Sequence, residues 1–191
     1  MSYTPNREQA WDLLCSYTEA EALRKHALAV EGVMRHFAER NGEDASLWGV
    51  VGLLHDLDYE KYPDQHCVKV REIMQEKDID ETIIHAVVSH GYGICSDTEP
   101  QSRMEKTLYA IDELTGLITA SALMRPSRSV MDLELQSLKK KYKAPNFAAG
   151  VDRSIIERGA AMLDMPLDEL IMETILGMRE VAQVLGLDGE Q

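Results

Sequence analysis

The chain has 191 residues, of which 45% are hydrophobic and 28% are charged, and its net charge is -13. These values fit one soluble globular domain over residues 1–191, and no apolar run approaches the ~20 residues that span a bilayer. The acidic balance excludes an extended nucleic-acid surface, because phosphate backbones are bound by clustered Lys and Arg.

Apolar residues recur with helical period through nearly every segment, so we predict an all-α fold. Asn41-Gly42 is expected to end the second helix, Asp44 or Ser46 to cap the third, and Pro63 to start the fourth. Residues 186–191 are expected to form a frayed tail. In chain order, the helices are expected at about residues 6–17, 19–40, 46–54, 63–76, 80–90, 103–123, 130–142, 152–163 and 166–185.

Four separated pieces of the sequence have the residue types and the order of a helical metal site. They are His26, the adjacent pair His55-Asp56, His90 and Asp112. The pair follows a nearly unbroken apolar run, so burial of an imidazole and a carboxylate there needs compensation. Such side chains from different helices can converge only in the middle of a bundle, where they suit Mn, Fe, Co, Ni, Zn or Mg. We therefore predict a site for a divalent metal ion.

The same residues and their surroundings resemble the HD superfamily of metal-dependent phosphohydrolases, whose pattern is His, then His-Asp, then a distant Asp. His26, His55-Asp56 and Asp112 match this pattern one for one. The strongest piece is LLHDLDYEKYP and the second is YAIDELTGLITASALMRPSRS. The resemblance implies an all-α HD domain with its core motif region at residues 23–128 and a C-terminal helical extension at 129–191.

Some branches of the superfamily, including the HDIG and HD-GYP groups, use further histidines to bind a second ion, with the HD aspartate as a bridge. His66, in the first turn of the fourth predicted helix, and His90 occupy comparable places. The resemblance therefore implies one or two divalent ions. The chain differs from the HD-GYP group, with Ser89-His90 for His-His and HDLDYEK for HDIGK. The cyclic dinucleotide activity of that group is not carried over.

The activity that the resemblance implies is hydrolysis of a phosphate ester in a nucleotide or another small phosphorylated metabolite, by a metal-activated water. Asp58 or Lys61, just beyond the HD pair, is expected to act on the proton of that water or on the phosphate. Basic residues are expected to bind the phosphate, because Arg offers a planar fork and Lys a point charge. These basic residues are Arg125, Arg128, Lys140 and Lys141.

Two alternative functions stay open at the level of the sequence. One is a di-iron oxygenase of the HD type, which requires His66 and His90 to hold a second iron. The other is a non-catalytic, metal-binding regulatory module. His85 is interpreted as structural, and His36 as a surface or interface residue.

The cysteines and the N-terminus give information about the cellular environment. Cys15, Cys67 and Cys95 are widely separated and form no CxxC motif, so we expect reduced thiols. The first residues lack the basic start and apolar stretch of a signal peptide, so a cytoplasmic location is expected. Trp11 and Trp48 lie on apolar helix faces, which leaves a homodimer as an option.

Overall fold

The computed structural model describes residues 2–189 and confirms the all-α fold. Within this range there are ten α-helices and one 3-10 turn (η1), and no β-strand. None of these helices combines the length and the hydropathy that a membrane span requires. The elements are α1 (Arg7–Tyr17), α2 (Glu21–Asn41), α3 (Ala45–Leu54), η1 (Pro63–Gln65), α4 (Val68–Glu76), α5 (Glu81–Ser89), α6 (Arg103–Leu123), α7 (Leu135–Tyr142), α8 (Arg153–Met162), α9 (Leu167–Glu180) and α10 (Ala182–Leu185).

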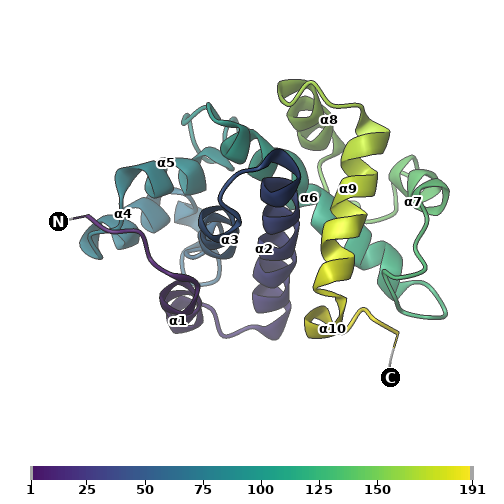
Figure 1. Ribbon diagram of the computed structural model, residues 1–191, viewed down its shortest axis with the longest axis horizontal. Coiled ribbons are helices and arrows are strands. Elements are labelled where there is room, and N and C mark those ends of the chain that lie inside the picture. Colours follow the sequence, from purple (N-terminus) through teal and green to yellow (C-terminus); the bar gives the residue numbers. More distant parts are fainter. Residues whose placement is uncertain (1, 190–191) are drawn as a thin grey trace.

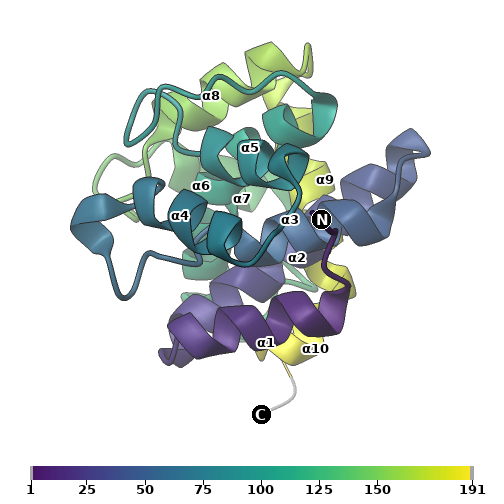
Figure 2. The ribbon, with the colours of Figure 1, turned by 90° about the vertical axis from the view of Figure 1, so that its left-hand side faces the viewer.

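Helices α2 and α6 run through the middle of the molecule, between two groups of helices (Figure 1). Helices α1, α3, α4 and α5 form the first group, which faces the viewer in Figure 2, and α7 to α10 form the second. Helix α2 packs against α3, α6 and α9, and α6 packs against α5, α8 and α9. One hydrophobic cluster therefore extends from Ala10 to Leu187. The single domain over residues 1–191 stays a prediction, which this shared core supports.

Side-chain caps explain where several helices begin. Asn6 accepts a hydrogen bond from the backbone of Gln9, whose side chain accepts one from the backbone of Asn6. Ser102 forms the same capping box with Glu105 at the start of α6. Asp44 caps α3 through two backbone amides. Each such cap contributes about 1 kcal/mol by satisfying amides that have no partner within the helix.

The fourth helix begins later than predicted. Residues 63–65 form only the 3-10 turn η1, and the chain then breaks at His66 and Cys67 before α4 begins at Val68. Cys67 has a φ of 69°, in the left-handed region that non-glycine residues seldom adopt. His66 therefore lies in the break and not in the first turn of a helix.

The C-terminal segment also differs from the prediction. The helix expected over 166–185 is interrupted at Val181, which packs directly against Gly32 of α2. Leu187 is buried, and its carbonyl accepts a hydrogen bond from the backbone amide of Val130 at 2.8 Å. This bond holds the chain out of helical geometry at Val130, and α7 begins only at Leu135. Leu187 is thus part of the core and not of a frayed tail, whereas its neighbours Gly186 and Gly189 are exposed and residues 190–191 lie outside the described range.

The two tryptophans differ in burial. Trp48 lies inside the core with 3% of its surface exposed, and Trp11 is partly buried against the same core. Trp48 therefore offers no surface to a second copy of the chain. The homodimer stays a prediction without that support.

Of the two roles expected for His36, surface or interface, the structure shows a contact between helices, because His36 joins α2 to α9. Its Nε2 lies 2.8 Å from Glu173 Oε2, and its Nδ1 lies 2.6 Å from Glu180 Oε1. Arg40, one turn later, also pairs with Glu173. Burial opposes the charged imidazole, but the two carboxylates outweigh it and raise the pKa of His36.

We expect the contribution of His36 to stability to fall as the pH rises. A raised pKa in the folded state means that the stabilisation is fully present below the unfolded pKa of 6.5 and is lost through the raised value. Urea unfolding should show a difference of about 1 kcal/mol between the wild type and His36→Gln near pH 6, and a smaller one near pH 9. An equal difference at both pH values would contradict the protonated bridge.

Candidate metal centre

Four side chains from three helices and one turn form the first site. His26 comes from α2, His55 ends α3, Asp56 follows in the next turn, and Asp112 lies in α6. His26 Nε2 lies 3.2 Å from His55 Nε2 and 3.0 Å from Asp112 Oδ1. His55 Nε2 lies 3.3 Å both from Asp112 Oδ1 and from Asp56 Oδ2. Ligand atoms around one ion are separated by roughly 3.0–3.4 Å when each lies ~2.1 Å from it, so this set has the spacing of a coordination shell.

The close approach of α2 and α3 depends on Gly52. A Cβ at this position would lie 3.1 Å from both the Cα and the N of Glu31 in α2. Because Gly52 has no Cβ, α3 can pack closely enough on α2 for His55 to reach His26. The glycine at position 52 thus allows the contact between His26 and His55.

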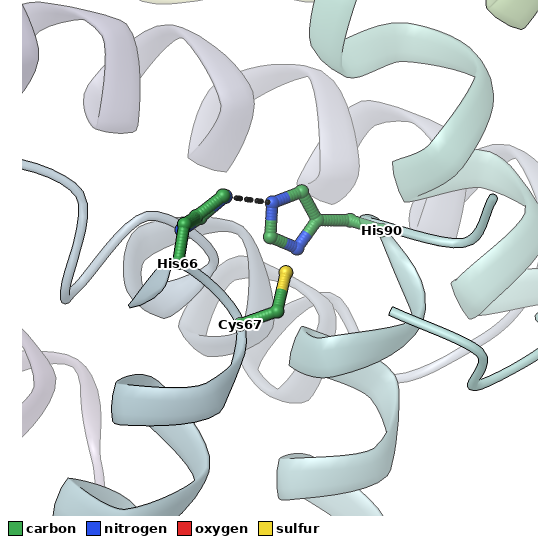
Figure 3. A group of neighbouring side chains, drawn as sticks. All are labelled: His66, Cys67 and His90. Carbon is green, nitrogen blue, oxygen red and sulfur yellow. Dashed lines mark hydrogen bonds between the residues drawn. The ribbon is translucent and has the colours of Figure 1, made fainter. Parts of the chain in front are cut away.

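The second site consists of His66, His90 and the other oxygen of Asp56. His66 lies in the break before α4, and His90 is the residue that ends α5. Their Nε2 atoms are 3.1 Å apart, and Figure 3 shows the two rings in contact. Each Nε2 atom lies 3.4 Å from Asp56 Oδ1. One carboxylate therefore faces both sites, Oδ2 toward the first and Oδ1 toward the second.

Contacts of the Nδ1 atoms determine which ring nitrogen carries the hydrogen in His55, His66 and His90. His55 Nδ1 donates to the Gly52 carbonyl at 2.7 Å, and His90 Nδ1 donates to the Val87 carbonyl at 2.5 Å. His66 Nδ1 lies 2.7 Å from a carboxylate oxygen of Asp58. In the neutral rings the Nε2 atoms then carry lone pairs directed at one another and at Asp56. Lone pairs in this arrangement repel unless a cation lies among them, so these residues fit a metal ion.

The electrostatics of the cluster favour a positive charge. Burial opposes protonation of His55, but Asp56 and Asp112 outweigh it and hold the pKa of His55 well above its ordinary value. Burial also opposes ionisation of Asp56 and Asp112, yet the neighbouring histidines hold the pKa of each carboxyl well below its ordinary range. A field that attracts a proton this strongly also attracts a divalent cation.

The two sites form the floor of a cavity of about 350 Å³. Five of the six side chains line it directly, whereas His55 is completely buried behind them. Tyr59, Tyr109 and Glu113 also line the cavity, beside apolar residues that include Ile94 and Ile155. Its size is within the range of small-molecule sites.

A second cavity of about 440 Å³ lies next to the first. His26 and Gly116 line both cavities, so the two share a wall. Lys25 and Arg128 line the second cavity together with apolar residues of α6 and of the C-terminal segment. Of the four basic residues predicted to bind phosphate, Arg128 therefore lines a cavity next to the metal-type ligands.

Three other basic residues lie elsewhere than expected. Arg125 pairs with Asp132 at 2.9 Å, and Lys141 lies over the ring of Phe147. Neither these two nor Lys140 line either of the two cavities. These three residues are close to Arg128 in the sequence, but they lie in the α6–α7 loop and in α7, outside both cavities.

The two residues expected to act on the water also lie outside the cavity. Lys61 Nζ donates to the carbonyl of Ser16 at 2.7 Å and covers the ring of Tyr17. Asp58 is completely buried, and its two oxygens contact His66 Nδ1 and the backbone amide of Val70. Asp58 thus contacts His66 and the start of α4 and does not line the cavity, and its catalytic role stays a prediction without support from its position.

Several residues in or beside the cavity were not identified from the sequence. Tyr109 precedes Asp112 by three residues, so helical spacing could have placed both on one face. Glu113 adjoins Asp112, and burial together with that neighbouring carboxylate raises the pKa of Glu113. Arg158 donates to the hydroxyl of Tyr109 at 3.1 Å. Arg158 lies far from the motifs in the sequence, and no local pattern indicates its position.

The structure also separates the remaining histidine from the cluster. His85 Nδ1 lies 2.9 Å from Glu105 Oε1, in the capping box of α6. This contact agrees with the structural role expected for His85.

The fold and the site thus define an all-helical protein with two groups of side chains that could hold a metal ion, one of His26, His55 and Asp112 and the other of His66, Cys67 and His90. The family model of the HD domain matches residues 23–117, a range that includes every residue of both sites. The chain therefore belongs to the HD superfamily, as the sequence motifs predict. No solved structure matches the chain.

Proposed function

We propose that this protein is a metal-dependent phosphohydrolase that acts on a nucleotide or another small phosphorylated metabolite. The observation that carries the proposal is the position of Asp56, whose two oxygens face two separate histidine groups at the floor of one cavity. Carboxylate-bridged sites of this kind suit phosphoryl transfer, because two cations can stabilise both the attacking and the leaving oxygen.

The charge of the cavity supports a role for the ions in substrate binding. Asp56, Asp112 and Glu113 line it, whereas no Lys or Arg among residues 2–189 does so. Such a cavity would repel a phosphate unless bound cations reversed its potential. The ions and the phosphate are thus expected to bind together.

The roles of the chain's own residues follow from their contacts. His26, His55 and Asp112 would hold one ion, His66 and His90 the other, and Asp56 both. A bound divalent ion supplies Lewis acidity and lowers the pKa of water. Tyr109 lines the cavity although its side chain is fully buried, and the hydrogen bond that its hydroxyl accepts from Arg158 would hold the ring in place beside the ligands.

The second cavity suggests what the rest of the substrate is like. Lys25 and Arg128 offer positive charge there, beside the apolar side chains of Leu123 and Leu187. A substrate with a reacting phosphate in the first cavity would place a second anionic group and an apolar or aromatic portion in this one. Nucleotides have this combination of groups.

Arg128→Ala is expected to raise KM about tenfold while kcat changes little. The guanidinium would contact a part of the substrate distant from the reacting phosphate, and a charged hydrogen bond is worth ~1.5 kcal/mol or more. Steady-state kinetics on the best nucleotide substrate would measure both constants. Arg125→Ala, three residues earlier and outside both cavities, is the control, and an equal rise in KM for both variants would contradict the assignment.

The proposal itself is tested on protein purified without chelator and without a metal-affinity tag. Elemental analysis would give the metal and the number of ions per chain, and a panel of phosphate esters would be assayed before and after chelation. We expect hydrolysis that disappears with chelation and returns with Mn, Fe or another divalent ion. Bound metal without turnover on any ester would favour the regulatory module, and iron-dependent oxygen consumption would favour the oxygenase.

A further inference from the structure

Two cysteines that are 28 residues apart in the sequence meet beside the second site. Cys67 follows His66 directly, and Cys95 lies in the loop after His90. Their sulfur atoms are 2.7 Å apart, closer than two thiols that merely pack together. The pair lies outside the helices, in the break before α4 and in the turn after α5.

The surrounding residues are shaped around this pair. At Gly91 an added Cβ would collide with both sulfur atoms, so the absence of a side chain there makes room for the two thiols. Cys67 has the left-handed backbone conformation, which is uncommon for a residue with a side chain. In Figure 3 the sulfur of Cys67 lies to one side of the contact between His66 and His90. The hydrogen-bond partner of this sulfur is Cys95, and the ligand atoms of His66 and His90 lie within 4.8 Å of it.

We infer that Cys67 and Cys95 form a reversible dithiol–disulfide pair that responds to a peroxide. The sulfur atoms would need to approach by only about 0.65 Å to reach the ~2.05 Å of a disulfide bond. The bond would close a loop over residues 67–95 that contains His90, and it would begin at the residue directly after His66. It would therefore covalently join the two segments that carry the histidines of the second site. Cytosolic disulfides of this kind usually serve as redox sensors.

The order of the two steps follows from exposure. Cys95 lines the cavity, whereas Cys67 is 2% exposed, so the oxidant reaches Cys95 first. The sulfur of Cys95 attacks one oxygen of hydrogen peroxide, the O–O bond breaks, and a sulfenic acid and one water result. The sulfur of Cys67 then attacks the sulfenic sulfur, the S–O bond breaks, and a second water leaves with the disulfide formed. Two thiols are oxidised and one peroxide is reduced, and a dithiol reductant reverses the change.

The test uses the protein as purified, with hydrogen peroxide as the probe. After treatment, free thiols are alkylated, and intact mass and peptide mapping identify the bonded cysteines. We expect one intrachain bond between Cys67 and Cys95, reversed by dithiothreitol, and complete loss of this bond in Cys67→Ser and in Cys95→Ser. Cys15→Ser is the matched control, because Cys15 lies in α1, away from the pair, and this variant should form the bond as the wild type does.

The melting temperature gives a second readout that does not depend on activity. A disulfide formed within the native structure should raise Tm by roughly 5–10 °C, because it restricts the unfolded chain. The inference is overturned if both Cys67 and Cys95 are still free thiols that can be alkylated after peroxide treatment, or if the bond lowers Tm. Neither result depends on the proposed hydrolase activity, so failure of one proposal is distinguishable from failure of the other.

Discussion

Asp56→Asn should lower kcat for phosphate ester hydrolysis by about 1,000-fold or more and reduce the bound metal. The carboxylate of Asp56 contributes one oxygen to each site, so a neutral amide weakens the attraction for both ions at once. Bound divalent ions would supply several kcal/mol of charge stabilisation in the transition state, and each 1.36 kcal/mol corresponds to a factor of ten in rate. Steady-state kinetics and elemental analysis of the same preparation would measure both effects.

The matched control for Asp56→Asn is Asp64→Asn. Asp64 is exposed in the 3-10 turn η1 and lines neither cavity beside the metal-type ligands. The control should retain wild-type kinetics and metal content. Because the amide has nearly the size of the carboxylate, circular dichroism should show that Asp56→Asn is folded. Full activity in a folded Asp56→Asn would show that the reaction does not use the bridging carboxylate.

The fold class could be predicted because helical periodicity and caps are local properties of the sequence. Asn6, Asp44 and Ser102 each act on amides within three residues, and the helices that they open begin where expected. The break at His66 and the interruption at Val181 were not predictable in this way. Each is accompanied by contacts with a distant part of the chain: His66 with His90, and Val181 with Gly32.

The candidate ligands could be identified because the superfamily pattern fixes both residue type and order. His26, His55, Asp56 and Asp112 meet at one point although 86 residues separate the first from the last. The surroundings of the ligands follow no such pattern. Arg125 and Arg128 are three residues apart, yet only Arg128 lines a cavity next to the site. Proximity in the sequence to Arg128 was therefore a poor guide to a position beside the cavities.

Asp58 illustrates the same limit, because its role depends on which atoms its oxygens contact. The sequence shows a carboxylate two residues after the HD pair and favours a part in catalysis. In the structure Oδ1 holds the Nδ1 hydrogen of His66, and Oδ2 accepts from the amide of Val70 at the start of α4. Asp58 therefore determines which nitrogen of His66 is free to bind a metal ion.

Asp58→Asn is accordingly expected to weaken binding of the second ion 10- to 100-fold and to leave the first ion in place. The amide has one acceptor oxygen for two donors, so either His66 or Val70 loses its partner. If His66 loses it, the ring can move its hydrogen to Nε2, the atom that faces His90 and Asp56.

Metal titration of the apoprotein, followed by calorimetry, would separate the two binding steps. In Asp58→Asn the step at His26, His55 and Asp112 should keep its wild-type affinity, because no contact joins Asp58 to those ligands. Asp64→Asn should keep both steps. Equal weakening of the two steps would indicate a general loss of structure, and two unchanged steps would show that His66 does not need the carboxylate behind it. Selective loss of the second step, with hydrolysis reduced in proportion, would establish that the buried carboxylate acts through His66 and that the reaction uses both ions.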